Sequence, residues 1–142
     1  MKLLLDTHIA LWAVTDSPKL GPVARELILA PENTIHVSTA TLWEIAIKYA
    51  LNKGRTGGAG GVPGHGDMPV SSVRAAELFT LSGYQPLPIE WAHTEAVSAL
   101  PTVKTHADPF DRMLIAQARA EAMLLLTRDA AVADYGVPVM LV

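Results

Sequence analysis

Several residue types that support common protein chemistries are missing from this chain. Its 142 residues include no cysteine, which excludes a thiol nucleophile, a cysteine-ligated zinc ion and a disulfide framework. No run approaches the roughly 18 apolar residues that a membrane span requires, because Asp6 and His8 interrupt the apolar amino terminus. The sequence therefore predicts a soluble, cytoplasmic protein with no membrane partner.

An excess of positive charge is also lacking. The chain has 11 Lys+Arg against 14 Asp+Glu, a formal net charge of -3, which argues against a protein that coats nucleic acid with a basic face. Half of the residues are hydrophobic. A domain of this length buries about 68–70% of the surface that its unfolded chain exposes, so we expect one domain over residues 1–142. Any functional role of the acidic residues therefore depends on where they lie in the chain.

Short apolar runs alternate with segments of helical period along the chain. We expect strands at residues 2–5, 34–37, 123–127 and 137–141, and helices at about 7–14, 22–30, 39–52, 72–82, 91–99, 109–121 and 129–134. A short segment at 85–89 is interrupted by Pro86 and Pro88. This alternation predicts an α/β domain whose mainly parallel central sheet is flanked by helices.

Seven of the ten glycines fall in Gly54–Gly66. Together with Pro63 they indicate an excursion within the domain rather than a linker between domains. The segment does not resemble a phosphate-binding loop, which needs a lysine directly after its glycines, because Lys53 precedes them instead.

Aspartates follow two of the predicted strands or open a helix. Asp6 follows the first strand, Asp129 follows residues 124–127, and Asp108 and Asp111 lie in the first turn of one helix. The carboxyl ends of parallel strands share one edge of a sheet, where such folds bind ligands, so these side chains can converge. Each aspartate also has a simpler interpretation as a helix cap, and for any one of them taken alone both interpretations stay open.

Glu44 is less easily explained by local structure. It lies in the middle of a helix among Leu42, Trp43 and Ile45, where an unpaired buried carboxylate is costly. The alternative is a surface ion pair with Lys48 one turn later, which contributes only about 0.3–0.5 kcal/mol.

A cluster of Asp6, Glu44, Asp111 and Asp129 would place four like charges close together. Such a cluster is stable only when a cation neutralises it, and carboxylate oxygens suit Mg²⁺, for which Mn²⁺ can substitute. An ion of this kind activates water for attack on a phosphodiester. The acids therefore favour a metal-dependent phosphodiesterase.

Four segments of the chain, in order and spacing, resemble the PIN-domain ribonucleases, and in particular the VapC-type toxins of type II toxin–antitoxin systems. The segments are Leu3–His8, Ser38–Ile45, His106–Ala118 and Leu126–Asp129, and the stretch His-Ala-Asp-Pro-Phe-Asp-Arg is the most distinctive. The resemblance spans essentially the whole chain and implies a PIN-like three-layer fold.

Carried over residue by residue, the resemblance implies that Asp6, Glu44, Asp111 and Asp129 are the catalytic, metal-binding acids. It leaves Asp108 as either a further metal ligand or a group that supports the ligands, and it implies that the hydroxyls of Thr7 and Ser38 orient the carboxylates. His8 and His106 are expected to support the site rather than to act as bases, and His65 is expected to be solvated.

The same resemblance implies a Mg²⁺-dependent endoribonuclease that is the toxin of a toxin–antitoxin pair, with a small cognate antitoxin and a homodimeric assembly. The apolar first helix fits either a dimer contact or core packing, and both remain open. Because an acidic centre needs cations around it to hold RNA, we expect RNA contacts from Arg112, Arg128 and Lys48, with Lys53, Arg55 and Lys104 as further candidates, and a single-stranded substrate.

Two other functions are considered. Another Mg²⁺-dependent phosphohydrolase also places acids at strand ends, but a phospho-aspartate enzyme has a second aspartate two residues after the first, where this chain has His8. A non-catalytic RNA- or protein-binding module of the same fold is expected to have lost one of the four acids, and none is missing here.

Overall fold

The computed structural model describes residues 1–53, 68–103 and 106–142. One sheet contains β1 (Lys2–Leu5), β2 (Thr34–Ser38), β3 (Gln85–Leu87), β4 (Leu124–Thr127) and β5 (Val139–Leu141). The strand order is β3-β2-β1-β4-β5, and every neighbouring pair is parallel. The predicted α/β class with a parallel central sheet is confirmed.

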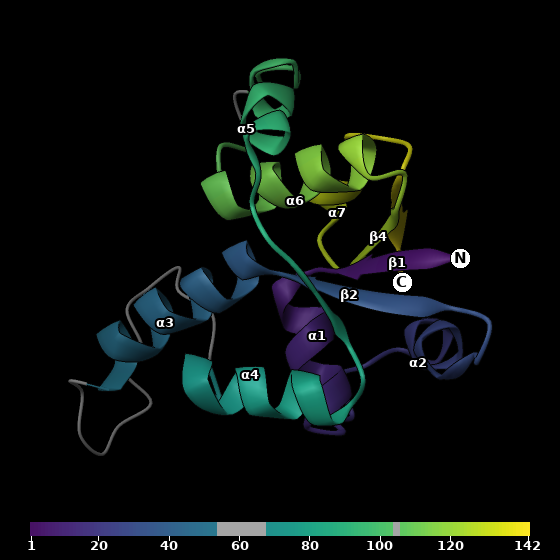
Figure 1. Ribbon diagram of the computed structural model, residues 1–142, viewed down its shortest axis with the longest axis vertical. Coiled ribbons are helices and arrows are strands. Elements are labelled where there is room, and N and C mark those ends of the chain that lie inside the picture. The colour runs from purple at the N-terminus through teal and green to yellow at the C-terminus, as the bar shows by residue number, and fades with distance from the viewer. Residues whose placement is uncertain (54–67, 104–105) are drawn as a thin grey trace.

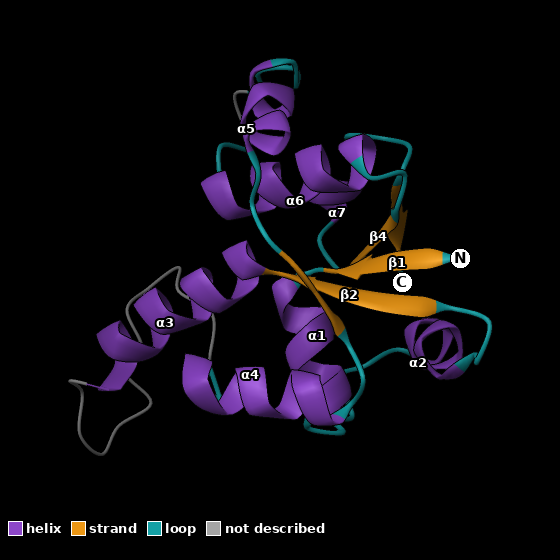
Figure 2. Cartoon of the chain, viewed as in Figure 1, coloured by secondary structure: helices purple, strands orange, loops and turns teal. Residues whose placement is uncertain are grey.

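Helices cover both faces of this sheet (Figures 1 and 2). One face carries α1 (Thr7–Val14), α2 (Pro22–Leu29) and α4 (Ser72–Leu81); the other carries α5 (Trp91–Ser98), α6 (Pro109–Ala120) and α7 (Ala130–Ala133). The long helix α3 (Thr39–Lys53) follows β2 directly and contacts α1, α4 and α6. The molecule thus has three layers, with β1 at the centre of the sheet.

The alternating directions of side chains along β1 divide the core in two. Leu3 and Leu5 belong to the cluster beneath α1, α2 and α4, whereas Leu4 belongs to the cluster beneath α5, α6 and α7. All three leucines are fully buried, as expected for a central parallel strand covered on both faces. This packing fixes the end of β1, and therefore the position of Asp6.

Two strand predictions need correction. Residues 85–87, expected only as a proline-interrupted segment, form the edge strand β3 and pair with β2. Pro86 lacks a backbone N–H to donate, which an edge strand tolerates. The last strand begins at Val139, two residues later than predicted, after Pro138.

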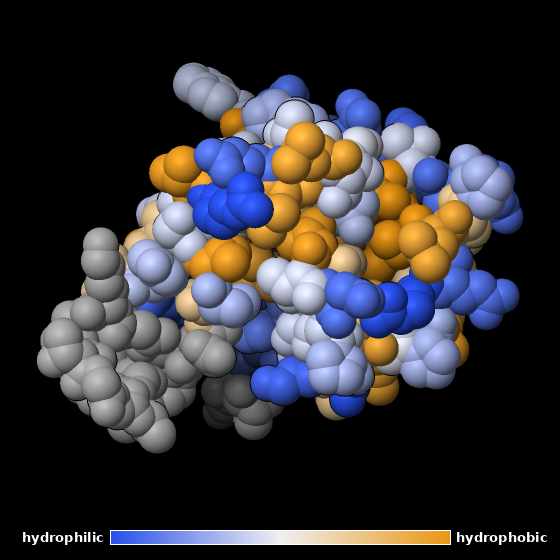
Figure 3. Space-filling view, turned by 90° about the horizontal axis from the view of Figure 1, so that it is seen from below, coloured by the Kyte–Doolittle hydropathy of each residue, from blue (hydrophilic) through white to orange (hydrophobic). Residues whose placement is uncertain are grey.

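The first helix contributes to the core and not to an exposed apolar face. Ile9 and Leu11 are buried, and Trp12 and Val14 pack against the same cluster. Exposed apolar side chains occur elsewhere, including Trp43, Ile47 and Leu51 on α3. Figure 3 shows the face formed by α1, α2 and α4, on which hydrophobic groups are interspersed with hydrophilic ones.

Within the described residues, no helix has both the length and the apolar character that a membrane crossing requires. The predicted glycine-rich excursion, His65, Arg55 and Lys104 lie outside the described residues, as does the side chain of Lys53.

Candidate metal centre

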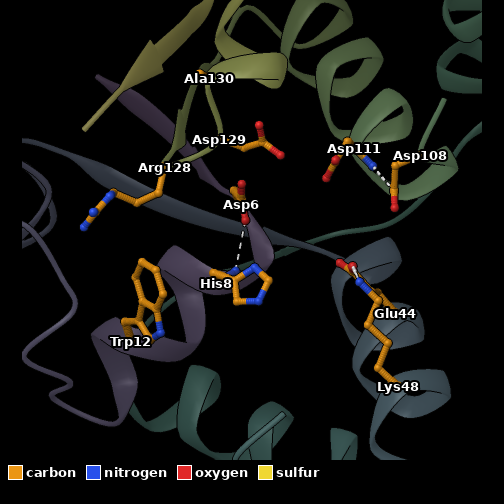
Figure 4. A pocket seen from close by; sticks show the side chains of 10 residues that line it. All are labelled: Asp6, His8, Trp12, Glu44, Lys48, Asp108, Asp111, Arg128, Asp129 and Ala130. Carbon is orange, nitrogen blue, oxygen red and sulfur yellow. Dashed lines mark hydrogen bonds and ion pairs between the residues drawn. The ribbon is translucent and has the colours of Figure 1, made fainter. Parts of the chain in front are cut away.

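A pocket of about 540 Å³ opens at the carboxyl edge of the sheet, where β1 and β4 end (Figure 4). All five of the acids singled out from the sequence line it. The lining residues are Asp6, His8, Trp12, Glu44, Lys48, Asp108, Asp111, Arg128, Asp129 and Ala130. The structure therefore brings together acids that lie up to 123 positions apart in the chain, from Asp6 to Asp129.

Asp6 lies at the centre of the pocket and is almost fully buried. Its Oδ1 accepts a hydrogen bond of 2.9 Å from the backbone N–H of His8 and so caps α1, while its Oδ2 accepts one of 2.5 Å from the Thr127 hydroxyl. Burial raises the pKa of Asp6, and the negative charge of Glu44 raises it further; the hydrogen bonds from Thr127 and His8 act in the opposite direction.

Asp129 faces Asp6 from the end of β4. Its Oδ1 accepts a hydrogen bond of 2.8 Å from the backbone N–H of Ala131, which caps α7, and its own N–H donates to the Thr127 hydroxyl at 3.0 Å. The Thr127 hydroxyl accepts from Asp129 and donates to Asp6. One buried side chain therefore ties the ends of β1 and β4 together.

Asp108 and Asp111 approach the pocket from the first turn of α6. Asp108 Oδ1 accepts hydrogen bonds from the backbone N–H groups of Phe110 and Asp111, at 2.9 and 3.0 Å, so the predicted capping role is confirmed. Asp111 Oδ2 lies 3.0 Å from His106 Nε2. Burial, and then the charges of Asp108, Asp6 and Glu44, raise the pKa of Asp111 to about 7, although the His106 hydrogen bond lowers it.

Glu44 enters the pocket from α3 and is buried, not at the surface. Its Oε1 accepts a hydrogen bond of 2.5 Å from the Thr7 hydroxyl, and its Oε2 forms an ion pair of 2.5 Å with Lys48 Nζ. The Thr41 hydroxyl lies 3.3 Å from that of Thr7. The Lys48 pair considered from the sequence is therefore present, but it is a largely buried pair that lines the pocket.

The remaining predicted residues have varied surroundings. Ser38 is buried, and its hydroxyl accepts from the backbone N–H of Ala40 at 3.0 Å; among the described residues it donates to no carboxylate, contrary to the expected orienting role. Arg128 lines the pocket, donates to the Lys19 carbonyl at 2.9 Å and lies over the Trp12 ring at 5.8 Å. Arg112 points away from the acids toward Tyr135 and the Pro101 carbonyl.

Comparison with known proteins gives this arrangement a family. The model of the PIN domain family matches residues 3–138. The chain belongs to the PIN domain family. The solved structures include a chain of VapBC2 from Rickettsia felis, bound to a DNA fragment from its promoter, with a TM-score of 0.63 and 18% sequence identity over 100% of this chain and 98% of that one. No curated protein matches the sequence.

The donors of this PIN domain fit a hard divalent cation. Asp6 and Asp111 both have raised pKa values, because burial and neighbouring carboxylates disfavour their charged forms. A cation among them offsets both effects by favouring the charged carboxylates, and carboxylate oxygens are ligands that Mg²⁺ and Mn²⁺ accept. His106, Asp111 and Asp129 each offer a ligand atom, and these atoms lie within 4.8 Å of one another.

Three supporting residues of this PIN domain were not found from the sequence. The sequence places Thr127 at the end of a strand and within the PIN-like segment Leu126–Asp129 without indicating a role, and it indicates none for Thr41 or Tyr135. A signal for Thr127 exists, because a hydroxyl at the last position of a strand that precedes Asp129 is placed to bond that residue's backbone. Thr41 and Tyr135 act through partners distant in sequence, Thr7 and His106, which no local pattern reveals.

Proposed function

We propose that this PIN domain is a divalent-metal-dependent endoribonuclease and the toxin of a toxin–antitoxin pair. The observation that carries the proposal is the convergence of Asp6, Glu44, Asp108, Asp111 and Asp129 on one pocket. Membership of the family supports the proposal, because PIN domains are generally nucleases. The likeness of the fold to that of a VapBC2 chain supports the toxin assignment.

The cation is proposed to be Mg²⁺, with Mn²⁺ as a substitute, held by Asp6, Glu44, Asp111 and Asp129. A bound ion of this kind activates water as a nucleophile and stabilises charge on the leaving oxygen of a phosphodiester. Thr7 and Thr127 fix the orientations of Glu44 and Asp6 through hydrogen bonds. Asp108 supports the site by holding the first turn of α6, and with it the backbone of Asp111.

Positively charged side chains that can bind an RNA backbone also line the pocket. Lys48 and Arg128 line it on opposite sides of Asp6 (Figure 4), and Arg128 packs over the Trp12 ring. We propose that these two side chains contact phosphates of a single-stranded RNA. Arg112, bound to Tyr135 and Pro101, is the weaker candidate of the three predicted from the sequence.

The test is RNA cleavage by the purified protein with Mg²⁺, with sequencing of the ends produced. We expect Asp6→Asn and Asp111→Asn to lose cleavage and to weaken Mg²⁺ binding measured by calorimetry. Asp134→Asn is the matched control, since it makes the same charge change at an exposed residue that does not line the pocket. If both pocket variants cleave RNA and bind Mg²⁺ like the parent, the site is wrongly assigned.

The same assay distinguishes the alternative functions. Metal binding without cleavage of any nucleic acid, together with RNA affinity, would indicate a non-catalytic binding module. Hydrolysis of small phosphate esters, with RNA left intact, would indicate another Mg²⁺-dependent phosphohydrolase.

A small antitoxin is the proposed protein partner. The five acids of the pocket form a negatively charged site. A positively charged side chain of an antitoxin has the opposite charge and so complements this site. The gene next to that of this protein should then encode a small DNA-binding protein. When it is co-expressed, the two should purify as a complex in which RNA cleavage is suppressed, and a complex with full cleavage would refute this part of the proposal.

A homodimer is also proposed. The first helix does not support a dimer contact, because it packs into the core. The support comes from α3, where Trp43, Ile47 and Leu51 are exposed at spacings of one helical turn. Mass measurement by light scattering tests it.

A further inference from the structure

A chain of hydrogen bonds leads away from the metal pocket behind Asp111. Asp111 Oδ2 lies 3.0 Å from His106 Nε2, and His106 Nδ1 lies 3.2 Å from the Tyr135 hydroxyl. That hydroxyl in turn accepts a hydrogen bond of 2.8 Å from Arg112 Nη1. Neither His106 nor Tyr135 lines the pocket, so the chain supports the site from behind.

The donors in this chain favour one direction for its hydrogen bonds. A guanidinium group has only donors, so the Tyr135 oxygen accepts from Arg112 and its own proton is available for His106 Nδ1. A ring nitrogen that accepts leaves the proton on the other nitrogen in a neutral imidazole. When Tyr135 donates its proton to Nδ1, the proton of His106 lies on Nε2 and points at the Asp111 carboxylate.

The geometry holds the imidazole ring at both ends. The side chains of His106 and Tyr135 are nearly buried, and the two rings meet edge to face with centroids 5.5 Å apart. Arg112 is fixed by a second hydrogen bond of 2.9 Å to the Pro101 carbonyl and lies over the Tyr135 ring. The ring cannot turn away from Asp111 without breaking this packing.

We propose that His106 is a positioning residue, which Tyr135 and Arg112 hold in the tautomer that donates from Nε2 and so fixes the orientation of the Asp111 carboxylate toward the cation. The inference rests on the proposed function, because it assigns Asp111 as a ligand. It gives Arg112 a role different from the RNA contact predicted from its sequence position. Groups that orient metal-binding carboxylates typically change metal affinity about 10–100-fold when they are removed.

A direct ligand role for His106 is the competing possibility, since its Nε2 lies 3.0 Å from Asp111 Oδ2 and one of its ring nitrogens lies within 4.8 Å of a carboxylate oxygen of Asp129. A ligating nitrogen carries no proton, so this possibility requires Nε2 to be unprotonated when metal is bound. The positioning role requires a proton on His106 Nε2 when metal is bound, whereas the ligand role requires that nitrogen to have none.

The first experiment locates that proton. Long-range ¹H–¹⁵N spectra of the protein at pH 8, without metal and with saturating Mg²⁺, report which nitrogen of each histidine is protonated. His93 provides an internal reference, because its Nδ1 accepts from the backbone N–H of Glu90 at 3.0 Å and its Nε2 faces Glu121 at 2.8 Å. We expect His106 to show the same Nε2-protonated signature as His93 in both states. A proton on Nδ1, or loss of the Nε2 proton when Mg²⁺ binds, overturns the proposal.

The second experiment measures Mg²⁺ affinity by calorimetry in three variants. His106→Leu removes the donor and should weaken binding about 10–100-fold. His106→Gln keeps an amide donor near the place of Nε2 and should recover most of that loss. Tyr135→Phe removes the hydroxyl that selects the tautomer; it should weaken binding less than His106→Leu and reduce the share of the Nε2-protonated form. If His106→Gln binds as weakly as His106→Leu, or Tyr135→Phe leaves both readouts unchanged, positioning is refuted.

A matched control separates positioning from a general effect on folding. His93→Gln alters a second buried histidine–carboxylate pair, and His93 does not line the pocket. It is expected to lower the unfolding midpoint while leaving Mg²⁺ affinity unchanged. Because the tautomer and the affinity are both read without RNA, a protein that fails to cleave RNA would refute the proposed function and leave this inference to be judged by its own two readouts.

Discussion

Replacing the Asp111 carboxyl group with an amide should stabilise the metal-free protein, and it should do so only at high pH. Burial and the neighbouring carboxylates raise the pKa of Asp111 from 3.8 to about 7. Between these two values the folded protein holds a proton that the unfolded chain has released. The free energy of unfolding of the parent therefore falls as pH rises through this range, with a slope of up to about 1.4 kcal/mol per pH unit from this group.

The size of the effect follows from the shift. Three pKa units correspond to about 4 kcal/mol, which is the upper limit of what ionised Asp111 costs the metal-free fold above pH 7. As pH falls through 3.8 the unfolded chain also takes up the proton, Asp111 becomes neutral in both states, and the cost disappears. In Asp111→Asn the group no longer titrates, so the variant should be more stable than the parent at pH 8 and close to it at pH 4.

Urea unfolding in EDTA at pH 4 to 8.5 measures both curves, and Asp134→Asn serves as the control for an equal change of charge. Saturating Mg²⁺ should reverse the order at pH 8, since only the parent has the carboxylate that binds the ion. The reasoning would be refuted if the free energies of unfolding of parent and Asp111→Asn ran parallel against pH in EDTA, or if the variant were less stable at pH 8. Either result would mean that ionised Asp111 does not destabilise the metal-free fold.

Three further perturbations test other parts of the structure. Thr127→Val removes the hydroxyl that joins Asp6 to the backbone of Asp129 and should cost about 1–3 kcal/mol in urea unfolding, whereas Thr127→Ser, which keeps the hydroxyl, should recover most of the loss. Arg128→Gln should weaken RNA binding for all sequences and reduce the slope of log affinity against log salt by about 0.7; an unchanged slope would place Arg128 outside the RNA contact. Ile47→Asp on the exposed face of α3 should halve the mass seen by light scattering, while Val73→Asp, at a still more exposed position on α4, should leave it unchanged; a parent with the 15.2 kDa mass of one chain would refute the homodimer.

The sequence was sufficient for the fold class because the strands are of the buried parallel kind. Leu3, Leu4 and Leu5 form an uninterrupted apolar run, which is typical of a strand covered on both faces, and the structure places that run in the middle of the sheet. β3 was missed as a strand because Pro86 and Pro88 interrupt its short apolar pattern. Its place at the edge, where one side needs no hydrogen bonds, is a property of the whole sheet and not of residues 85–87.

The convergence of the acids was predictable for a related reason. Asp6 and Asp129 each follow a parallel strand, so the topology alone brings them to one edge of the sheet. Which hydroxyl or imidazole supports each acid was less accessible. Thr7 was identified as an orienting residue and does bond Glu44, but Thr127 and Tyr135 act across elements whose relative placement the sequence does not specify.

Capping and metal binding, which the sequence presents as alternative uses of the aspartates, are compatible with each other in the hydrogen bonds of the structure. Asp129 uses Oδ1 to cap α7, which leaves Oδ2 available, and Asp6 caps α1 while each of its oxygens retains acceptor capacity. A cap holds a carboxylate at the start of a helix that itself begins where a strand ends. Capping therefore fixes Asp6 and Asp129 at the shared edge before any ion binds. We infer that these two helix caps preorganise the pocket.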